Sequence, residues 1–174
     1  DLGLSPCAIR LGVIGAARAE KNVQLVLDAF HACSRQDLQL FVVCIENETV
    51  PDDPRIVAIP NDHVAEHVYQ QRLCVIDAIV FPFDAGMLMT GTAFDAIGAG
   101  KAAITSDWPL LAEVFGDAAI PYGSTREELT ERFETLSAQE VEVSQQAMDA
   151  CRQRTEWSDI AQQTLELLEE VARS

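Results

Sequence analysis

Residues 77–113 constrain the fold of this chain more than any other segment. The segment opens with an apolar run at residues 76–83. Such runs form strands that are covered on both faces in a parallel sheet. A helix is predicted to begin at Thr90-Gly91-Thr92 and to end at Gly98-Ala99-Gly100, followed by a strand at residues 101–105. The small residues at the helix start leave backbone N–H groups accessible, which suits a phosphate. We therefore predict a ligand cradle between two parallel strands.

The rest of the chain also alternates between strand and helix patterns. Capping-box pairs, Thr125 with Glu128 and Ser137 with Glu140, mark the starts of two C-terminal helices. Further strands are predicted at residues 10–15, 38–45, 55–59 and 118–121, and further helices at residues 22–34, 62–73, 126–136, 138–153 and 156–172 and from Pro109. This alternation predicts an α/β fold, a Rossmann-like parallel sheet with helices on both faces. We expect one domain over residues 1–174, with the C-terminal helices from about residue 125.

Two segments resemble, in the same order, the C-terminal, donor-binding half of the GT-B glycosyltransferases, in particular the retaining family 4 (group 1). The first is the strand and loop GVIGAARAEKNVQLVLDAF at the front of the chain. The second carries the motif residues Phe81-Pro82, Thr90-Gly91-Thr92, Asp95-Ala96, Gly98-Ala99-Gly100-Lys101, Asp107-Trp108-Pro109-Leu110 and Glu113-Val114. Together the two segments span most of residues 9–122.

The resemblance implies the nucleotide-sugar-binding domain of an enzyme that moves a sugar from a nucleoside diphosphate sugar to an acceptor hydroxyl. It implies no metal and no cofactor, because the nucleotide sugar is the substrate. The N-terminal acceptor domain is absent from this chain, so we expect the isolated domain to be inactive. The chain begins at Asp1 rather than Met, and we expect it to be a piece of a longer protein.

The first candidate site lies in the loop after the first strand. Gly15 allows a tight turn, and Arg18 and Lys21 project cations from the carboxyl edge of the sheet, where α/β proteins bind ligands. In the resembling family, an Arg and a Lys of this loop hold the donor diphosphate and stabilise it as it leaves. Lys21 aligns with that Lys. Ala16 stands where the Arg usually follows the Gly, and Arg18 matches members that place it two residues later.

The second candidate site covers residues 84–95. Many family members carry two glutamates here, one facing the transferred sugar and one holding the ribose hydroxyls. Asp95 aligns with the second, one methylene shorter, and Met87 stands at the first, where it offers no strong hydrogen bond. Asp84 is a candidate substitute for the sugar contact. Thr90, Gly91 and Thr92 are candidates for the phosphate end.

One motif suggests a metal site and so competes with the glycosyltransferase resemblance. His63-Val64-Ala65-Glu66-His67 fits the His-x-x-Glu-His pattern of inverted zinc proteases, but no evident third ligand with its own motif follows. We predict that these histidines bind no structural metal. The five cysteines lack zinc spacing and are interpreted as reduced thiols, with Cys44 and Cys74 expected to be buried.

Composition limits the partners. The net charge of −16 argues against nucleic acid and against an anionic membrane surface as partners of this domain. No apolar stretch reaches the ~20 residues of a membrane span. We expect a soluble, cytoplasmic domain whose partners are the nucleotide-sugar donor and the N-terminal domain. Trp157 is predicted to be a core anchor of the last helix, and the apolar stripe Ile160, Leu165 and Leu168 is a candidate interface with the missing half.

Two alternatives stay open. A degenerate, non-catalytic GT-B-like module with an interaction or regulatory role is favoured by Met87 and by the shorter Asp95. A flavodoxin-like or receiver domain would carry an acidic cluster after the first strand, where Arg18 and Lys21 stand instead.

Overall fold

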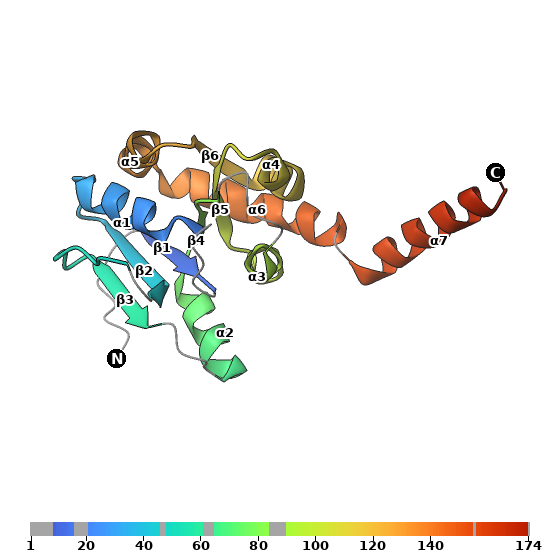
Figure 1. The fold of residues 1–174 in the computed structure, drawn as a ribbon, viewed down its shortest axis with the longest axis horizontal. Coiled ribbons are helices and arrows are strands. Elements are labelled where there is room, and N and C mark those ends of the chain that lie inside the picture. Colours follow the sequence, from blue (N-terminus) through green and yellow to red (C-terminus); the bar gives the residue numbers. More distant parts are fainter. Residues whose placement is uncertain are drawn as a thin grey trace.

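A computed structural model describes residues 9–15, 21–45, 48–60, 65–83, 90–154 and 156–173. Within these residues, six strands form one all-parallel sheet in the order β3-β2-β1-β4-β5-β6 (Figure 1). The strands are β1 (Ile9–Ile14), β2 (Leu38–Ile45), β3 (Ile56–Pro60), β4 (Ala78–Phe81), β5 (Ala102–Ser106) and β6 (Ala119–Gly123). The predicted parallel sheet is confirmed. The chain runs outward from β1 to β3 and then returns to β4 on the other side of β1, so the order reverses between β1 and β4.

The helices begin and end close to their predicted bounds, except for the helix predicted over residues 62–73, which begins at Glu66, with residues 62–64 outside the described residues. They are α1 (Val23–Ala32), α2 (Glu66–Val75), α3 (Gly91–Ala99), α4 (Pro109–Phe115), α5 (Arg126–Thr135), α6 (Ala138–Arg154) and α7 (Trp157–Arg173), with a short 3-10 turn η2 (Gly116–Ala118). Both predicted capping boxes are present. Glu128 N–H donates to the Thr125 hydroxyl at 3.2 Å and Glu140 N–H to the Ser137 hydroxyl at 3.1 Å, while each glutamate accepts the cap residue's N–H in return.

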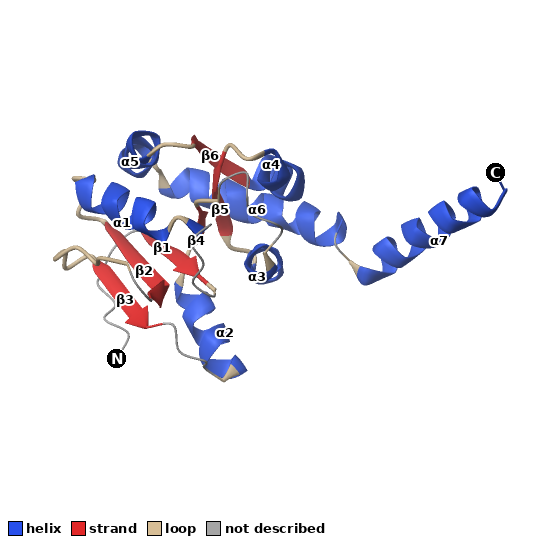
Figure 2. Cartoon of the chain, in the orientation of Figure 1, coloured by secondary structure: helices blue, strands red, loops and turns tan. Residues whose placement is uncertain are grey.

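Helices cover both faces of the sheet (Figure 2). Helices α1 and α5 pack on one face, where Phe30 and Phe133 meet edge to face with ring centroids 5.7 Å apart. Helices α2, α3 and α4 pack on the other face. Each face of the sheet thus has its own hydrophobic core, and strand β4 contributes to both. Val80 belongs to the core on the α1 side, and Ile79 and Phe81 belong to the core on the α3 side. This two-sided burial explains why the β4 sequence is apolar throughout rather than alternating.

Helix α6 lies along the amino ends of the strands. The Ser144 hydroxyl donates to Ala118 O at 2.5 Å and accepts from Ala103 N–H at 3.3 Å. The Gln145 amide donates to Asp77 O at 2.8 Å. These backbone groups stand before or at the start of β4, β5 and β6. Helix α6 is therefore tied to the edge opposite the carboxyl ends of the strands.

Helix α7 extends away from the rest of the molecule (Figure 1), and none of its residues is buried. The prediction that Trp157 anchors the core is wrong, because its side chain is 84% exposed. The apolar stripe predicted on this helix (Ile160, Leu165 and Leu168) is exposed, and Leu167 and Val171 on the same helix are exposed as well. The reason is the direction of the chain, which leaves the body of the domain after α6.

The cysteines divide by position. Cys33 and Cys151 are buried thiols whose pKa is raised by burial. The prediction of a buried Cys74 is wrong, because it is exposed. Its neighbour Leu73 is the buried residue of α2, and adjacent residues of a helix point about 100° apart. The side chain of Cys44 lies outside the described residues.

Candidate functional site at the carboxyl edge

The loops after β1 and β4 open side by side. These two strands pair directly, with Leu11 opposite Ala78, and both run toward the same edge of the sheet. The switch in strand order between them creates a crevice of the kind that binds ligands in open α/β sheets. Gly15 follows β1 with φ +100°, a left-handed conformation that favours glycine.

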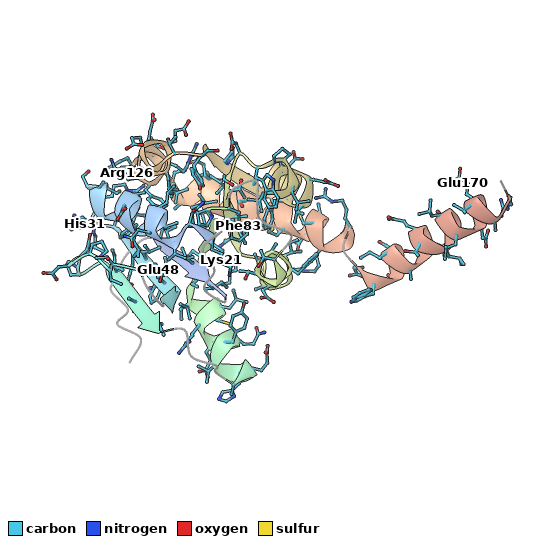
Figure 3. The ribbon with its side chains drawn as sticks, viewed as in Figure 1. Lys21, His31, Glu48, Phe83, Arg126 and Glu170 are labelled. Atoms are coloured by element: carbon cyan, nitrogen blue, oxygen red, sulfur yellow. The ribbon has the colours of Figure 1, made fainter. Side chains whose placement is uncertain are left out.

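Lys21 and Thr92 meet over this glycine. The Lys21 ammonium donates to Ile14 O at 3.2 Å, and the Thr92 hydroxyl donates to the same carbonyl at 3.5 Å. A Cβ added to Gly15 would stand 2.6 Å from Lys21 Nζ and 2.7 Å from Thr92 Oγ1. Lys21 precedes α1 and lies in the middle of the molecule, near β1 (Figure 3). It is only 4% exposed. The fold therefore brings together a cation and a hydroxyl that are 71 positions apart in the chain.

Two further hydrogen bonds hold the edge together. Asn22 adopts a left-handed conformation (φ 45°) before α1, and its side-chain amide donates to Pro82 O at 3.1 Å. The Ser106 hydroxyl at the end of β5 donates to Phe83 O at 2.6 Å. These contacts fix the exit of β4 against its neighbours on both sides. The sequence interpretation missed both residues, because each bonds to a backbone carbonyl of a distant segment and leaves no local signal.

Helix α3 presents its N-terminus at this edge. The Thr90 hydroxyl accepts a hydrogen bond from Thr92 N–H at 3.4 Å and so caps the helix. Gly91 is exposed, and a Cβ there would meet nothing within 4 Å. The start of α3 is therefore open at Gly91, while the buried Thr92 places it beside Lys21. A helix N-terminus of this kind carries a partial positive charge that attracts anions.

Asp95 lies one turn further along α3 and contacts α2. Its Oδ2 accepts a hydrogen bond of 2.6 Å from the Tyr69 hydroxyl. Burial and the charge of Asp95 raise the pKa of Tyr69 well above its usual range, so the phenol stays protonated at neutral pH. The sequence interpretation did not identify Tyr69. Arg18, Asp84 and Met87 lie outside the described residues.

No metal cluster is found in the part of the chain that the structure describes, where no three His, Cys, Asp or Glu side chains are placed to share an ion. His67 is exposed in the first turn of α2, and His63 lies outside the described residues. That these two histidines bind no structural metal stays a prediction. None of the described helices is long and apolar enough to cross a membrane.

A separate hollow of about 250 Å³ lies near the start of β6, lined in part by Ile120, Arg132, Glu140 and Val143. Its lining carries Asp117 and a paired Arg132 and Glu140, with Arg132 Nη1 standing 2.9 Å from Glu140 Oε1. Because that cation is already paired and Asp117 adds a second carboxylate, the hollow is a weak candidate for an anionic ligand.

Solved structures share this fold. The C-terminal domain of a glycosyl transferase group 1 family protein (LpcC) from Francisella tularensis matches 86% of this chain and 87% of its own, at 14% identity and a TM-score of 0.68. The chain has the fold of the C-terminal half of a GT-B glycosyltransferase. The fold class and the predicted resemblance are thereby confirmed at the level of structure.

Longer GT-B chains match as well. Sucrose-phosphate synthase from Thermosynechococcus elongatus matches 99% of this chain at 14% identity and a TM-score of 0.71. Anabaena HepE in complex with UDP and glucose matches 93% at 16% identity and a TM-score of 0.70. The match covers 48% of each of these two chains, so the present chain spans about half their length. No protein-family model matches the sequence, and no curated protein matches it significantly.

Proposed function

We propose that this domain binds the nucleoside diphosphate sugar of a glycosyltransferase and, with a second half of the enzyme, transfers the sugar to an acceptor hydroxyl. The observation that carries the proposal is the meeting of Lys21 and Thr92 over Gly15, beside the N-terminus of α3. The GT-B fold supports it, and structures of HepE contain UDP with glucose and UDP-glucose.

The chemistry assigned to the site is electrostatic. A leaving diphosphate gains negative charge as the sugar departs, and positive groups that already stand there stabilise that charge. Lys21 is shielded from water, which strengthens its interaction with an anion. To reach a diphosphate, its ammonium would exchange the neutral Ile14 carbonyl for a charged oxygen, and charge-assisted hydrogen bonds are the stronger kind. Arg18 from the same loop is proposed as the second cation.

The remaining contacts follow the family resemblance. Thr90, Gly91 and Thr92 are proposed to hold the phosphates through their N–H groups and hydroxyls. Asp95 is proposed to bind the ribose and Asp84 the transferred sugar. The acceptor site belongs to the other half, and the exposed stripe of α7 (Ile160, Leu165 and Leu168) is proposed to contact that half. The cytoplasmic location remains a prediction that fractionation of the source cells tests.

Calorimetry with UDP and GDP tests the proposal. We expect weak binding, because this domain forms only one wall of the cleft and much of the ligand stays in water. We expect no turnover, because the acceptor site belongs to the other half of the enzyme. Hydrogen bonds to charged groups contribute roughly 1.5–3 kcal/mol each, so Lys21→Ala should weaken binding by about ten- to a hundredfold. Met87→Ala should leave the diphosphate contact unchanged.

Lys101→Ala is the matched control. Lys101 stands before β5 at the opposite edge of the sheet, where its ammonium donates to Cys74 O at 3.1 Å. Its removal subtracts the same charge without touching the site, so nucleotide affinity should stay as in the wild type. If neither nucleotide binds at millimolar concentration, or if both lysine variants behave alike, the proposal is wrong.

The degenerate module is the second candidate. Met87 at the position of the family glutamate favours it, and so does Asp95, which is one methylene shorter than the family residue. This module would keep the fold without nucleotide affinity. Absence of binding in the same calorimetry would favour it.

A further inference from the structure

Tyr69 and Asp95 form a short contact between two helices that both begin at the carboxyl edge. Strand β3 leads into α2 and strand β4 into α3, so the first turns of these helices lie at the same edge of the sheet as Lys21. Tyr69 is in the first turn of α2, and Asp95 is in the second turn of α3. Their oxygens are 2.6 Å apart, within the range of charge-assisted O–H···O⁻ bonds.

The contact restrains both partners. Tyr69 is half-buried, with its ring against the core that α2 and α3 share, so its hydroxyl is held in place. Asp95 is also half-buried and forms no ion pair with any described Lys, Arg or His. Its second oxygen, Oδ1, accepts no hydrogen bond from the residues that the structure describes. One carboxylate oxygen is therefore fixed by the protein and one is left for a ligand.

We infer that Tyr69 is a positioning residue that orients Asp95 to accept a hydrogen bond from the ribose of the nucleotide. The inference rests on the proposed function and adds a residue to it. An aspartate is one methylene shorter than the glutamate of the resembling family and reaches less far. A fixed partner compensates, because a carboxylate already held in one rotamer loses less conformational entropy when the ligand binds.

Ligands that differ only at the ribose test this inference. The probes are the better-bound of UDP and GDP, its 2′,3′-dideoxy analogue and inorganic pyrophosphate, each titrated by calorimetry into the full chain. The wild type should bind the ribonucleotide about tenfold more tightly than the dideoxy analogue. Tyr69→Phe, which removes only the hydroxyl, should weaken ribonucleotide binding by about tenfold and leave affinity for the dideoxy analogue and pyrophosphate unchanged.

Two controls separate positioning from a merely structural role. Tyr122→Phe removes a hydroxyl from a buried tyrosine on the other face of the sheet and should leave discrimination between the two nucleotides intact. Asp95→Asn should abolish discrimination, and adding Tyr69→Phe to it should cause no further loss. Asp95→Asn on its own keeps the test decisive if Tyr69→Phe unfolds, because undiminished discrimination in that variant would overturn the inference.

The outcomes distinguish the inference from the proposed function. If the wild type binds neither nucleotide nor pyrophosphate, the proposed function fails and the inference with it. If the wild type binds a nucleotide and Lys21→Ala weakens it, but Tyr69→Phe discriminates between ribose and dideoxyribose as the wild type does, only the inference is wrong. The Tyr69–Asp95 contact would then be a link between helices and nothing more.

Discussion

At Gly15 the backbone adopts φ +100° while a lysine and a threonine occupy the space where a side chain would start. Backbone conformation and close approach therefore both require glycine there. The residue acts on the site indirectly, by letting Lys21 and Thr92 reach the Ile14 carbonyl. A change at Gly15 should consequently affect both stability and binding.

Gly15→Ala should lower the free energy of unfolding by about 1–3 kcal/mol, the usual strain of a non-glycine residue in such a conformation. It should also weaken nucleotide binding, because Lys21 Nζ must move from a Cβ that would stand 2.6 Å away. Urea unfolding and calorimetry measure the two effects. Gly98→Ala is the control. A Cβ at this exposed position within α3 meets nothing within 4 Å, so we expect a gain of about 0.5–1 kcal/mol. Equal stability changes in the two variants would contradict this account.

The ion pair of Asp53 and Arg55 gives a pH-dependent prediction. Arg55 Nη2 stands 2.6 Å from Asp53 Oδ2, and both side chains are largely buried. The hydrogen bond from Arg55 lowers the pKa of Asp53 from 3.8 to about 2. Because the folded pKa lies below the unfolded value, the stabilisation is complete above about pH 4 and disappears as the pH falls through about 2.

Asp53→Asn should therefore cost about 2 kcal/mol at pH 7, and the difference from the wild type should vanish near pH 2. Urea unfolding at several pH values measures this. Asp37→Asn is the matched control. Asp37 pairs with Arg35 at 2.7 Å, but its side chain is 50% exposed, and exposed pairs contribute at most about 1 kcal/mol. A cost for Asp53→Asn that stays constant from pH 7 to pH 2 would show that the carboxylate charge is not the cause.

At the scale of single elements, α5 shows how a local signal supports long-range packing. Its capping box fixes the helix start, and Leu129 and Phe133 then face the core shared with α1. The cap satisfies backbone N–H groups that the helix itself leaves without partners. Loss of the cap should loosen the helix at the end nearest β6.

Thr125→Ala should lower the free energy of unfolding by about 1 kcal/mol, the typical loss for an N-cap hydroxyl. Thr135→Ala near the other end of α5 is the control. The Thr135 hydroxyl donates to Glu131 O within the same helix and is exposed, so we expect a change within about 0.5 kcal/mol. Chemical denaturation of both variants measures the difference. The cap assignment would be contradicted if Thr135→Ala were the more destabilised.

At the scale of the whole molecule, the sheet domain and α7 differ in how they are held. The sheet domain has two cores, whereas α7 has no buried residue and shows its apolar side chains to solvent. Exposed stripes of several large apolar side chains mark surfaces that associate with a partner. The sheet domain should therefore determine the stability of the chain to unfolding, and α7 should determine its association with a partner.

A chain ending at Arg154 should unfold at the same urea midpoint as the full chain, because α7 adds no buried side chain to either core. The shorter chain should also self-associate less at high concentration, since Trp157, Leu167 and Leu168 are removed. Urea unfolding and sedimentation measure the two properties. A clear fall in the unfolding midpoint would mean that α7 packs on the domain in solution.

Much of the fold could be predicted from local pattern. Continuous apolar runs and period-3.6 stripes predict β4 and α1, and the polar pairs at Thr125 and Ser137 predict two helix starts. The predictions failed where burial depends on distant parts of the chain. Trp157 is typical of a buried anchor, yet nothing local states whether another element covers it. Cys74 failed for the same reason, since α2 turns it away from the core.

The candidate site also combines local and long-range features. The sequence by itself determined the alternation of strands and helices, the tight turn at Gly15 and the start of α3 at Thr90, because each depends on near neighbours. The order of the two loops also predicted that Lys21 shares a pocket with Thr90–Thr92. Only the tertiary structure decided that Lys21 and Thr92 meet at the Ile14 carbonyl and that Tyr69 meets Asp95. Such pairs depend on strand order and helix packing, which follow from the burial of the whole chain in one sheet with two cores.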